Sequence, residues 1–203
     1  MTGSKKKGRF PVAKLFLVVW IVGVSLALGS LGVSHLAAMP RPDDEARIAR
    51  AALALREDAS SDFIVHVIYA RCSCTARLFK HLVERKPFPG VHEMILFVGE
   101  DSTKRAAAEH AGYEFRTITR EELGSKFGLE VAPVMLVFDV KGELRYIGGY
   151  FDRPAAVTSL DEQIRGQVLA GANPDPLPVF GCAVDARLQR KVDPLGIVYR
   201  GQH

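Results

Sequence analysis

The chain has 203 residues, of which 48% are hydrophobic and 25% charged, so it has room for one domain with appendages. Its positive charge is local: Lys5, Lys6, Lys7, Arg9 and Lys14 precede the first apolar run, and the other 22 of the 27 basic residues stand against 23 acidic ones. The remainder is therefore nearly neutral. The basic pI of about 9.0 does not indicate a nucleic-acid partner, and we expect none.

A long apolar segment follows this basic start, which comprises residues 1–14. Residues 15–38 contain no Lys, Arg, Asp or Glu, and a helix of about 20 apolar residues spans the ~30 Å hydrocarbon core of a bilayer. Lysines on its N-terminal side favour a cytoplasmic N-terminus and an exported remainder. The alternative is a cleaved signal peptide, although residues 36–38 form a poor small-x-small cleavage site.

The location of the rest of the chain follows from this segment. We expect a single-pass protein of the bacterial inner membrane, anchored through its N-terminal helix, with the domain in the periplasm. Its cysteines then meet an oxidising compartment. Residues 39–62 connect the anchor to the domain, and the alanine-rich stretch at 43–56 has acids first and a base last, which suits a helix dipole. This stretch is either a stalk or the first helix of the domain.

From residue 63 the sequence alternates between strand and helix signals. The apolar runs predict strands at 63–70, 94–98, 115–118, 134–138 and 144–147. The intervening patterns predict helices at 76–84, 102–111, from 119 toward 128, and 155–169. Asp101 is placed to cap one helix and Gly112 to end it, while Thr119 and Glu122 have capping-box spacing. We therefore expect an α/β domain over residues 63–170, with parallel pairs and an antiparallel hairpin at one edge.

Two cysteines stand between the first strand and the first helix of this domain. Cys72 and Cys74 lie one residue apart at the expected helix start, where unpaired backbone N–H groups and the helix dipole favour thiolate over thiol. Thiolate is the reactive form of cysteine. Two such sulfurs can exchange a disulfide or share a soft metal ion, so this segment is the predicted seat of function.

The order of elements, with cysteines after the first core strand, resembles the thioredoxin fold. Residues 127–139, which contain Pro133, look like the thioredoxin-family segment in which a cis-proline precedes a core strand. Residues 139–148 are similar to the hairpin that follows it. The resemblance covers about residues 63–169 and implies a thioredoxin-like fold, a central mixed sheet flanked by helices. It also implies protein thiols and disulfides as partners, without a cofactor.

The resemblance also implies roles for individual residues. Cys72 matches the exposed nucleophile at the helix start, and Pro133 matches the cis-proline that faces the sulfurs. The backbone of Ala132 would then pair with an extended substrate peptide. A cis X-Pro bond costs only about 0.5–1 kcal/mol, so a fold can hold one where its geometry requires it.

The sequence departs from the family's Trp-Cys-x-x-Cys pattern in two ways. Arg71 stands in place of the tryptophan, and Thr75 occupies the usual position of the second cysteine. The second thiol, that of Cys74, comes one residue earlier and makes the segment Cys-x-Cys. A disulfide within it would close a small, strained ring, and strain raises the reduction potential toward that of an oxidant or an isomerase.

A third cysteine lies outside the thioredoxin pattern. An extended linker at residues 171–178 leads to Cys182 within a C-terminal extension, residues 171–203, and a helical run follows at 183–191. An odd cysteine in an exported protein suggests a reactive or an intermolecular thiol. Cys182 could resolve a disulfide of Cys72 or Cys74, ligate a metal beside them, or be buried and inert. Gly181 before it would allow close approach to another backbone.

Three function classes remain open at this point. In a thiol–disulfide oxidoreductase, Cys72 exchanges with a substrate disulfide and Cys74 or Cys182 resolves the mixed disulfide. In a copper chaperone the same thiols would bind Cu(I), which soft thiolates select. Copper-delivery members of the thioredoxin-like class combine a wider cysteine spacing with a distal histidine, and no histidine here falls in a matching motif, so we expect no bound metal. A tethered scaffold without chemistry leaves the paired cysteines unexplained.

Overall fold

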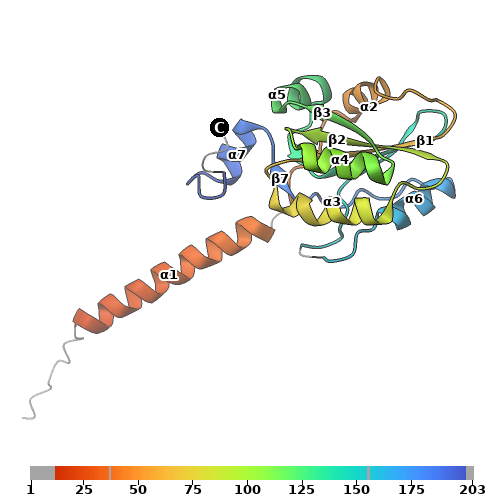
Figure 1. The fold of residues 1–203 in the computed structure, drawn as a ribbon. Helices are drawn as coiled ribbons and strands as arrows, with labels where there is room; N and C mark the ends of the chain where they lie inside the picture. The colour runs from red at the N-terminus through yellow and green to blue at the C-terminus, as the bar shows by residue number, and fades with distance from the viewer. Residues whose placement is uncertain (1–11, 37, 155, 200–203) are drawn as a thin grey trace, which may run out of the picture. The chain divides into compact units, whose positions relative to one another are not determined.

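The computed structural model describes residues 12–36, 38–154 and 156–199, apart from the side chains of residues 30–36, 73 and 74. The chain divides into two compact units at residues 37 and 38. The first contains helix α1, Val12–Leu36, in which Val12–Gly29 is long and apolar enough to cross a membrane (Figure 1). A signal sequence near the N-terminus also meets these criteria of length and composition. The basic residues 1–11 lie outside the described part.

The second unit is built on a five-stranded mixed sheet with the strand order β3-β2-β1-β5-β6. Its strands are β1 (Asp62–Tyr69), β2 (Val91–Val98), β3 (Glu114–Ile118), β5 (Val134–Phe138) and β6 (Leu144–Gly148). β1 pairs in parallel with β2, and β2 with β3, whereas β5 is antiparallel to both β1 and β6. The predicted parallel pairs and the antiparallel edge hairpin are thus confirmed.

A second, two-stranded sheet was not predicted. It consists of β4 (Val131–Ala132), directly before the proline, and β7 (Cys182–Ala183) in the C-terminal extension. The two strands pair antiparallel. This small sheet therefore connects the end of the chain to the segment that the sequence marks as part of the site.

Helices cover both faces of the central sheet. They are α2 (Glu45–Leu53), α3 (Ser73–Arg85), α4 (Ser102–Ala111), α5 (Arg120–Glu122) continued by the π-helical turn η1 (Leu123–Phe127), α6 (Asp161–Leu169) and α7 (Ala186–Val192). In Figure 1, α3 and α6 run along the lower side of the sheet and α2 and α5 along the upper side. Both faces are buried, so the central strand β1 reads as a nearly continuous apolar run.

The local signals at the helix ends are confirmed. The Asp101 side chain accepts a hydrogen bond from the backbone N–H of Lys104, and Gly112 adopts the left-handed conformation with φ of 102°. Thr119 and Glu122 form the full capping box in both directions. These caps fix where α4 and α5 begin, just beyond the carboxyl ends of β2 and β3.

The structure corrects the predicted start of the closing helix and decides between the two interpretations of residues 43–56. The closing helix begins at Asp161 rather than at residue 155: residues 156–160 are not helical, and residue 155 lies outside the described part. The Asp161 carboxylate is held by Arg85 Nε at 2.9 Å, which fixes the first turn of α6 there. For residues 43–56, the complete burial of Ile48 and Ala52 shows that α2 is the first helix of the domain.

A buried ionic network joins α3 and α6 to the sheet. Glu93 Oε2 lies 2.8 Å from His66 Nε2 and 2.7 Å from Arg85 Nη2. Arg85 also reaches Asp161, and His66 Nδ1 lies 2.8 Å from the hydroxyl of Tyr150. The buried charges of Arg85, Glu93 and Asp161 thus lie in ion pairs, which offsets part of the cost of their removal from water. His66, which the sequence places in the core strand, is a satisfied core residue.

Candidate functional site

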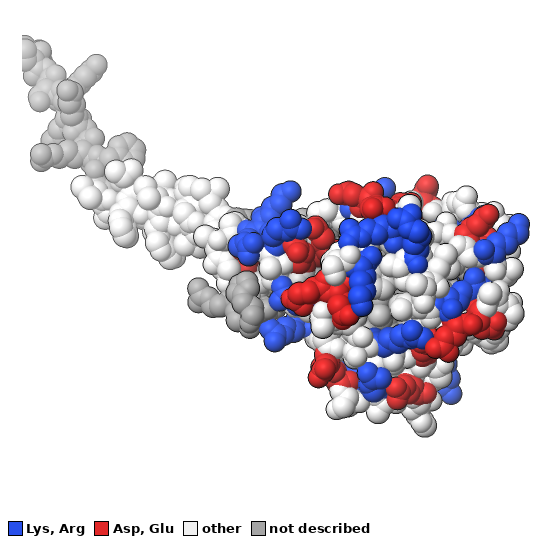
Figure 2. All heavy atoms as spheres, turned by 90° about the horizontal axis from the view of Figure 1, so that it is seen from above, with Lys and Arg blue, Asp and Glu red and all other residues white. Residues whose placement is uncertain are grey.

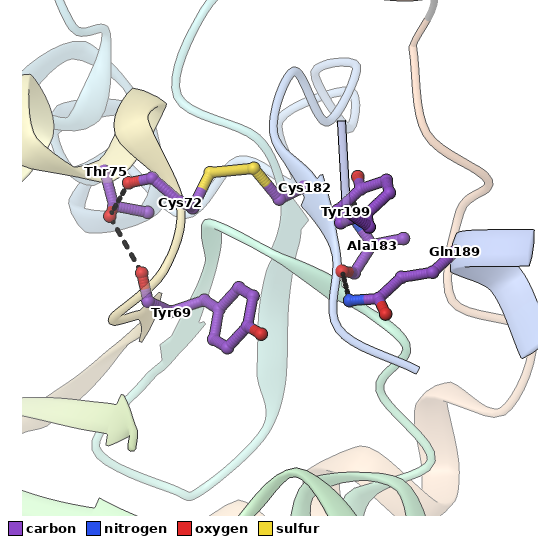
Figure 3. Close-up of a disulfide and its surroundings, with 7 residues drawn as sticks. All are labelled: Tyr69, Cys72, Thr75, Cys182, Ala183, Gln189 and Tyr199. Carbon is purple, nitrogen blue, oxygen red and sulfur yellow. Dashed lines mark hydrogen bonds between the residues drawn. A yellow bond between two sulfur atoms is a disulfide. The ribbon is translucent and has the colours of Figure 1, made fainter. Parts of the chain in front are cut away.

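The structure joins Cys72 to Cys182 in a disulfide. The two cysteines are 110 residues apart in sequence, and their Cα atoms lie 5.8 Å apart. Figure 3 shows the bond running from the start of α3 to the C-terminal extension. Among the arrangements considered for Cys182, the structure contains the one in which it folds back onto Cys72.

Cys72 is the N-cap residue of α3, and its side chain caps no backbone group. Its N–H donates to the carbonyl of Tyr69 at 3.2 Å, and its own carbonyl accepts from the N–H of Thr75 at 3.1 Å. The Thr75 hydroxyl lies 2.9 Å from the Tyr69 carbonyl oxygen and 2.7 Å from that of Cys72 (Figure 3). Thr75, at the usual second-cysteine position, is therefore a buried residue that ties the turn to the helix.

The expectation that Cys72 is exposed is wrong. The residue is only 3% exposed and belongs to the core cluster that also contains Val179 and Ala183 of the extension. It is covered because β7 pairs with β4 and brings Cys182 onto its sulfur. Cys182 itself is partly exposed, so it is the more accessible half of the disulfide.

Pro133 follows a cis peptide bond to Ala132, as predicted. Ala132 is paired, but with its own chain: Ala132 lies opposite Cys182, and Val131 opposite Ala183. The backbone that the resemblance assigns to a substrate peptide is therefore occupied by the C-terminal extension.

Two glycines allow this close approach of backbones. A Cβ atom built on Gly181 would lie 2.0 Å from the carbonyl oxygen of Ala132 and 2.6 Å from Cδ of Pro133. A Cβ on Gly149 would lie 2.0 Å from the carbonyl oxygen of Pro178. Any larger residue at either position would push the two backbones apart. The sequence pointed to Gly181 but gave no signal for Gly149.

Side chains secure the outer side of β7. The N–H of Ala183 donates to the Tyr199 hydroxyl at 2.8 Å, and its carbonyl accepts from Gln189 Nε2 at 2.9 Å. Arg120 Nε donates to the carbonyl of Val184 at 3.0 Å. Figure 3 shows Tyr199 and Gln189 gathered beside Ala183. No sequence pattern marked these residues, because the contacts join segments far apart in the chain.

Cys74 is the second residue of α3, and its side chain lies outside the described part. Its backbone is at the first turn of a 13-residue helix, as the sequence predicts. The described disulfide does not include it. A cleft of about 690 Å³ borders Arg71, next to Cys72 in sequence, at the carboxyl ends of β1, β2 and β3. Such crevices are common binding positions in α/β sheets.

Three histidines of the described part, His66, His81 and His92, have carboxylate partners. His81 Nε2 lies 3.0 Å from Asp161, and His92 Nε2 lies 2.6 Å from Glu114. Among the described residues, no three His, Cys, Asp or Glu side chains are grouped so that they could hold a metal ion. The described side chains thus add nothing in favour of the copper alternative.

Comparison with solved structures finds similar folds at low identity. A hypothetical protein from Sinorhizobium meliloti 1021 is 19% identical, with a TM-score of 0.50 over 73% of this chain and 91% of that one. An uncharacterized conserved protein from Geobacillus kaustophilus is 18% identical, with a TM-score of 0.48 over 62% and 77%. A secreted Mycobacterium tuberculosis disulfide oxidoreductase is 13% identical, with a TM-score of 0.37 over 55% and 82%.

No protein-family model and no curated protein matches the sequence. At these identities the likeness to solved structures concerns the fold alone. The chain itself has β2-β1-β5-β6 as four adjacent strands of its sheet, a cysteine at the start of the helix after β1, and a cis-proline before β5. The chain therefore has a thioredoxin-like fold.

Proposed function

We propose that this protein is an extracytoplasmic thiol–disulfide oxidoreductase that acts on the thiols and disulfides of other proteins. The observation that carries the proposal is the disulfide between Cys72 and Cys182, which joins the N-cap of α3 to the strand beside cis-Pro133. Cys74, in the same Cys-x-Cys segment, supplies a third thiol at the helix start.

The exchange takes two balanced steps. A thiolate of the partner protein attacks one sulfur of the Cys72–Cys182 bond, which forms a mixed disulfide and releases the other sulfur as a thiolate. A second thiolate of the partner then attacks the mixed disulfide. The partner leaves with a new disulfide, and both cysteines of this chain are reduced. The reverse sequence reduces a partner disulfide.

The exposure of the two cysteine residues suggests which sulfur is attacked. Cys182 is partly exposed, whereas Cys72 is buried. Attack on Cys182 would release Cys72 as the thiolate, and its N-cap position in α3 stabilises negative charge. Cys72 is then the leaving group when a partner dithiol is oxidised, and the freed Cys72 thiolate is the nucleophile when a partner disulfide is reduced.

The location of the reaction follows from the N-terminal helix. The apolar residues 15–38 would anchor the protein, with the basic residues 1–14 in the cytoplasm and the domain on the oxidising side. On the face shown in Figure 2, basic and acidic side chains of the domain are interspersed. This distribution suits partners recognised at the disulfide rather than through one strongly charged surface.

The test uses the full-length protein in detergent. Insulin reduction and refolding of scrambled ribonuclease would be measured for the unchanged chain and for Cys72→Ser, Cys182→Ser and Cys74→Ser. We expect at least a tenfold loss of activity in both assays for Cys72→Ser and for Cys182→Ser. Mass mapping under oxidising conditions reports whether Cys72 pairs with Cys182 or, within the Cys-x-Cys segment, with Cys74.

Redox titration of the same sample separates the alternatives. Structural disulfides typically have reduction potentials below about −300 mV. For an exchange centre we expect a reduction potential above that value. A lower potential without exchange activity would assign a purely structural role to the bond. Tight one-to-one Cu(I) binding to the reduced protein without exchange activity would favour the copper chaperone instead.

A further inference from the structure

We propose that residues 178–185, here named the occluding segment, are a built-in occupant of the peptide-binding edge at β4. We further propose that a peptide replacing this segment carries a glycine directly before its cysteine. This inference rests on the proposed exchange function and specifies both its substrate class and the condition under which the site is open.

The backbone pairing of β7 with β4 supports the proposal that the occluding segment occupies this edge. Cys182 lies opposite Ala132, and Ala183 opposite Val131, in an antiparallel pair. The N–H of Val184 extends the contact by donating to the carbonyl of Glu130 at 2.7 Å. An extended peptide cannot add to this side of β4 while β7 lies there, because the backbone hydrogen-bonding groups on that side of β4 already face β7.

The occluding segment also has the features of a bound substrate peptide. It presents a cysteine in an extended strand, bonded to the cysteine at the start of α3 and adjacent to cis-Pro133. The Cys72–Cys182 bond is thus the intramolecular equivalent of a mixed disulfide between this protein and a peptide. The geometry of the segment therefore shows what a true substrate must match.

The close approach at Gly181 supplies the specificity. A Cβ there would lie 2.0 Å from the carbonyl oxygen of Ala132, which is backbone and cannot rotate away. Ala183, on the other side of the cysteine, is fully buried and leaves no room for a larger side chain without repacking. The preferred peptide is consequently an extended Gly-Cys-small sequence.

Once the disulfide is cut, only a short backbone pairing joins the occluding segment to β4, although Val179, Ala183 and Val184 stay packed in the core cluster. The β4–β7 pair is two residues long, and the other fixed points of the segment include hydrogen bonds from Met39 N–H to Val179 and from Ala183 N–H to Tyr199. When a partner dithiol reduces the bond, the partner gains a disulfide and this chain gains two thiols. The segment then competes with other peptides through these noncovalent contacts and its effective concentration, and no longer through a covalent bond.

Hydrogen exchange tests the opening independently of activity. The full-length protein in detergent would be compared oxidised, reduced and as the Cys182→Ser variant. We expect the amides of Ala183 and Val184 to exchange at least tenfold faster in the last two states, with the amides of β5 unchanged as an internal reference. Equal protection in all three states would show that reduction does not release the segment and would overturn this part.

A peptide experiment tests the glycine requirement. The probe is a synthetic peptide with the sequence of residues 177–186, its cysteine activated as a mixed disulfide with thionitrobenzoate, and the matched control has alanine in place of its glycine. Both react with Cys72 in the full-length Cys74→Ser/Cys182→Ser double variant, and release of the chromophore gives the rate. We expect the glycine peptide to react at least tenfold faster.

The outcomes separate this inference from the proposed function. Equal rates for the two peptides would overturn the glycine requirement even if insulin reduction is normal. A strong glycine preference together with absent insulin reduction in the unchanged chain would overturn the proposed activity, while the assignment of the occluding segment to the β4 edge would stand.

Discussion

Cys182 lies opposite Ala132 in the β4–β7 pair and is at the same time bonded through sulfur to Cys72. One residue thus links the C-terminal extension to the rest of the domain in two ways, by backbone pairing with β4 and by a covalent bond to the start of α3. The two are coupled, since the pairing holds the sulfurs together and the bond holds the strands together. Changes to either should therefore affect the other.

The first prediction concerns stability. The disulfide closes a loop between residues 110 positions apart, so Cys182→Ser should lower the free energy of unfolding of the oxidised protein by about 2–4 kcal/mol. Urea unfolding of the full-length chain in detergent measures this. Cys72→Ser should behave alike, whereas Cys74→Ser should stay within about 0.5 kcal/mol of the unchanged protein. A large loss for Cys74→Ser with none for Cys182→Ser would contradict the pairing.

The second prediction concerns Gly181→Ala. The added Cβ meets the carbonyl oxygen of Ala132 at 2.0 Å, so β7 must move away from β4 and the sulfurs must separate. We expect at least a tenfold slower return of the Cys72–Cys182 bond after reduction, followed by thiol titration. The matched control is Gly166→Ala in α6, where a Cβ has nothing within 4 Å. Gly166→Ala should leave the rate at which the disulfide returns unchanged and should raise the free energy of unfolding by roughly 0.5–1 kcal/mol. Equal rates in the two variants would argue against the close approach.

Features that depend on residues close together in the sequence were predicted, whereas features that depend on contacts between distant segments were not. The caps at Asp101 and Thr119 and the hairpin of β5 and β6 were predicted because each depends on a few neighbouring residues with defined backbone preferences. The cis bond before Pro133 was instead expected from the resemblance to the thioredoxin fold. The parallel pairs and the antiparallel hairpin at one edge followed from the alternation of strand and helix patterns.

The parts that could not be predicted depend on contacts between distant segments. Strands of two residues, such as β4 and β7, have no periodicity to detect. The choice of Cys182 over Cys74 as the partner of Cys72 depends on where the extension returns, and so does the burial of Cys72. The late start of α6 reflects the ion pair of Asp161 with Arg85 on another helix.

The third prediction concerns the N-terminal helix. Because Val12–Gly29 forms an apolar helix long enough to span a bilayer, residues 15–38 should keep the protein in the membrane pellet after carbonate extraction. N-terminal sequencing of the same material should find the original N-terminus. A variant with Val19→Asp and Val22→Lys in this helix is the control and should be released. A soluble product with a new N-terminus near Met39 would instead identify a cleaved signal peptide.

The last prediction concerns acid stability and the buried carboxylate of Glu93. Burial alone would raise the pKa of Glu93, but hydrogen bonds from His66 and Arg85, and their charges, lower it to about 2 from the ordinary value of 4.5. A carboxyl whose pKa is lower in the folded state stabilises the fold above its unfolded pKa, and that contribution is lost as the pH falls. The free energy of unfolding should therefore decline between about pH 4.5 and pH 2.

Glu93→Gln tests this contribution directly. The variant removes the carboxylate that His66 and Arg85 share, while Arg85 keeps its ion pair with Asp161, so it should be destabilised by about 3–5 kcal/mol at neutral pH. It should also show a shallower decline in acid, because one of the titrating groups is gone. Urea unfolding at a series of pH values measures both effects. Glu109→Gln, which removes a half-exposed partner of Arg105, is the matched control and should cost less than about 1 kcal/mol. If the acid decline of Glu93→Gln were as steep as that of the unchanged protein, other carboxyl groups would be responsible for it.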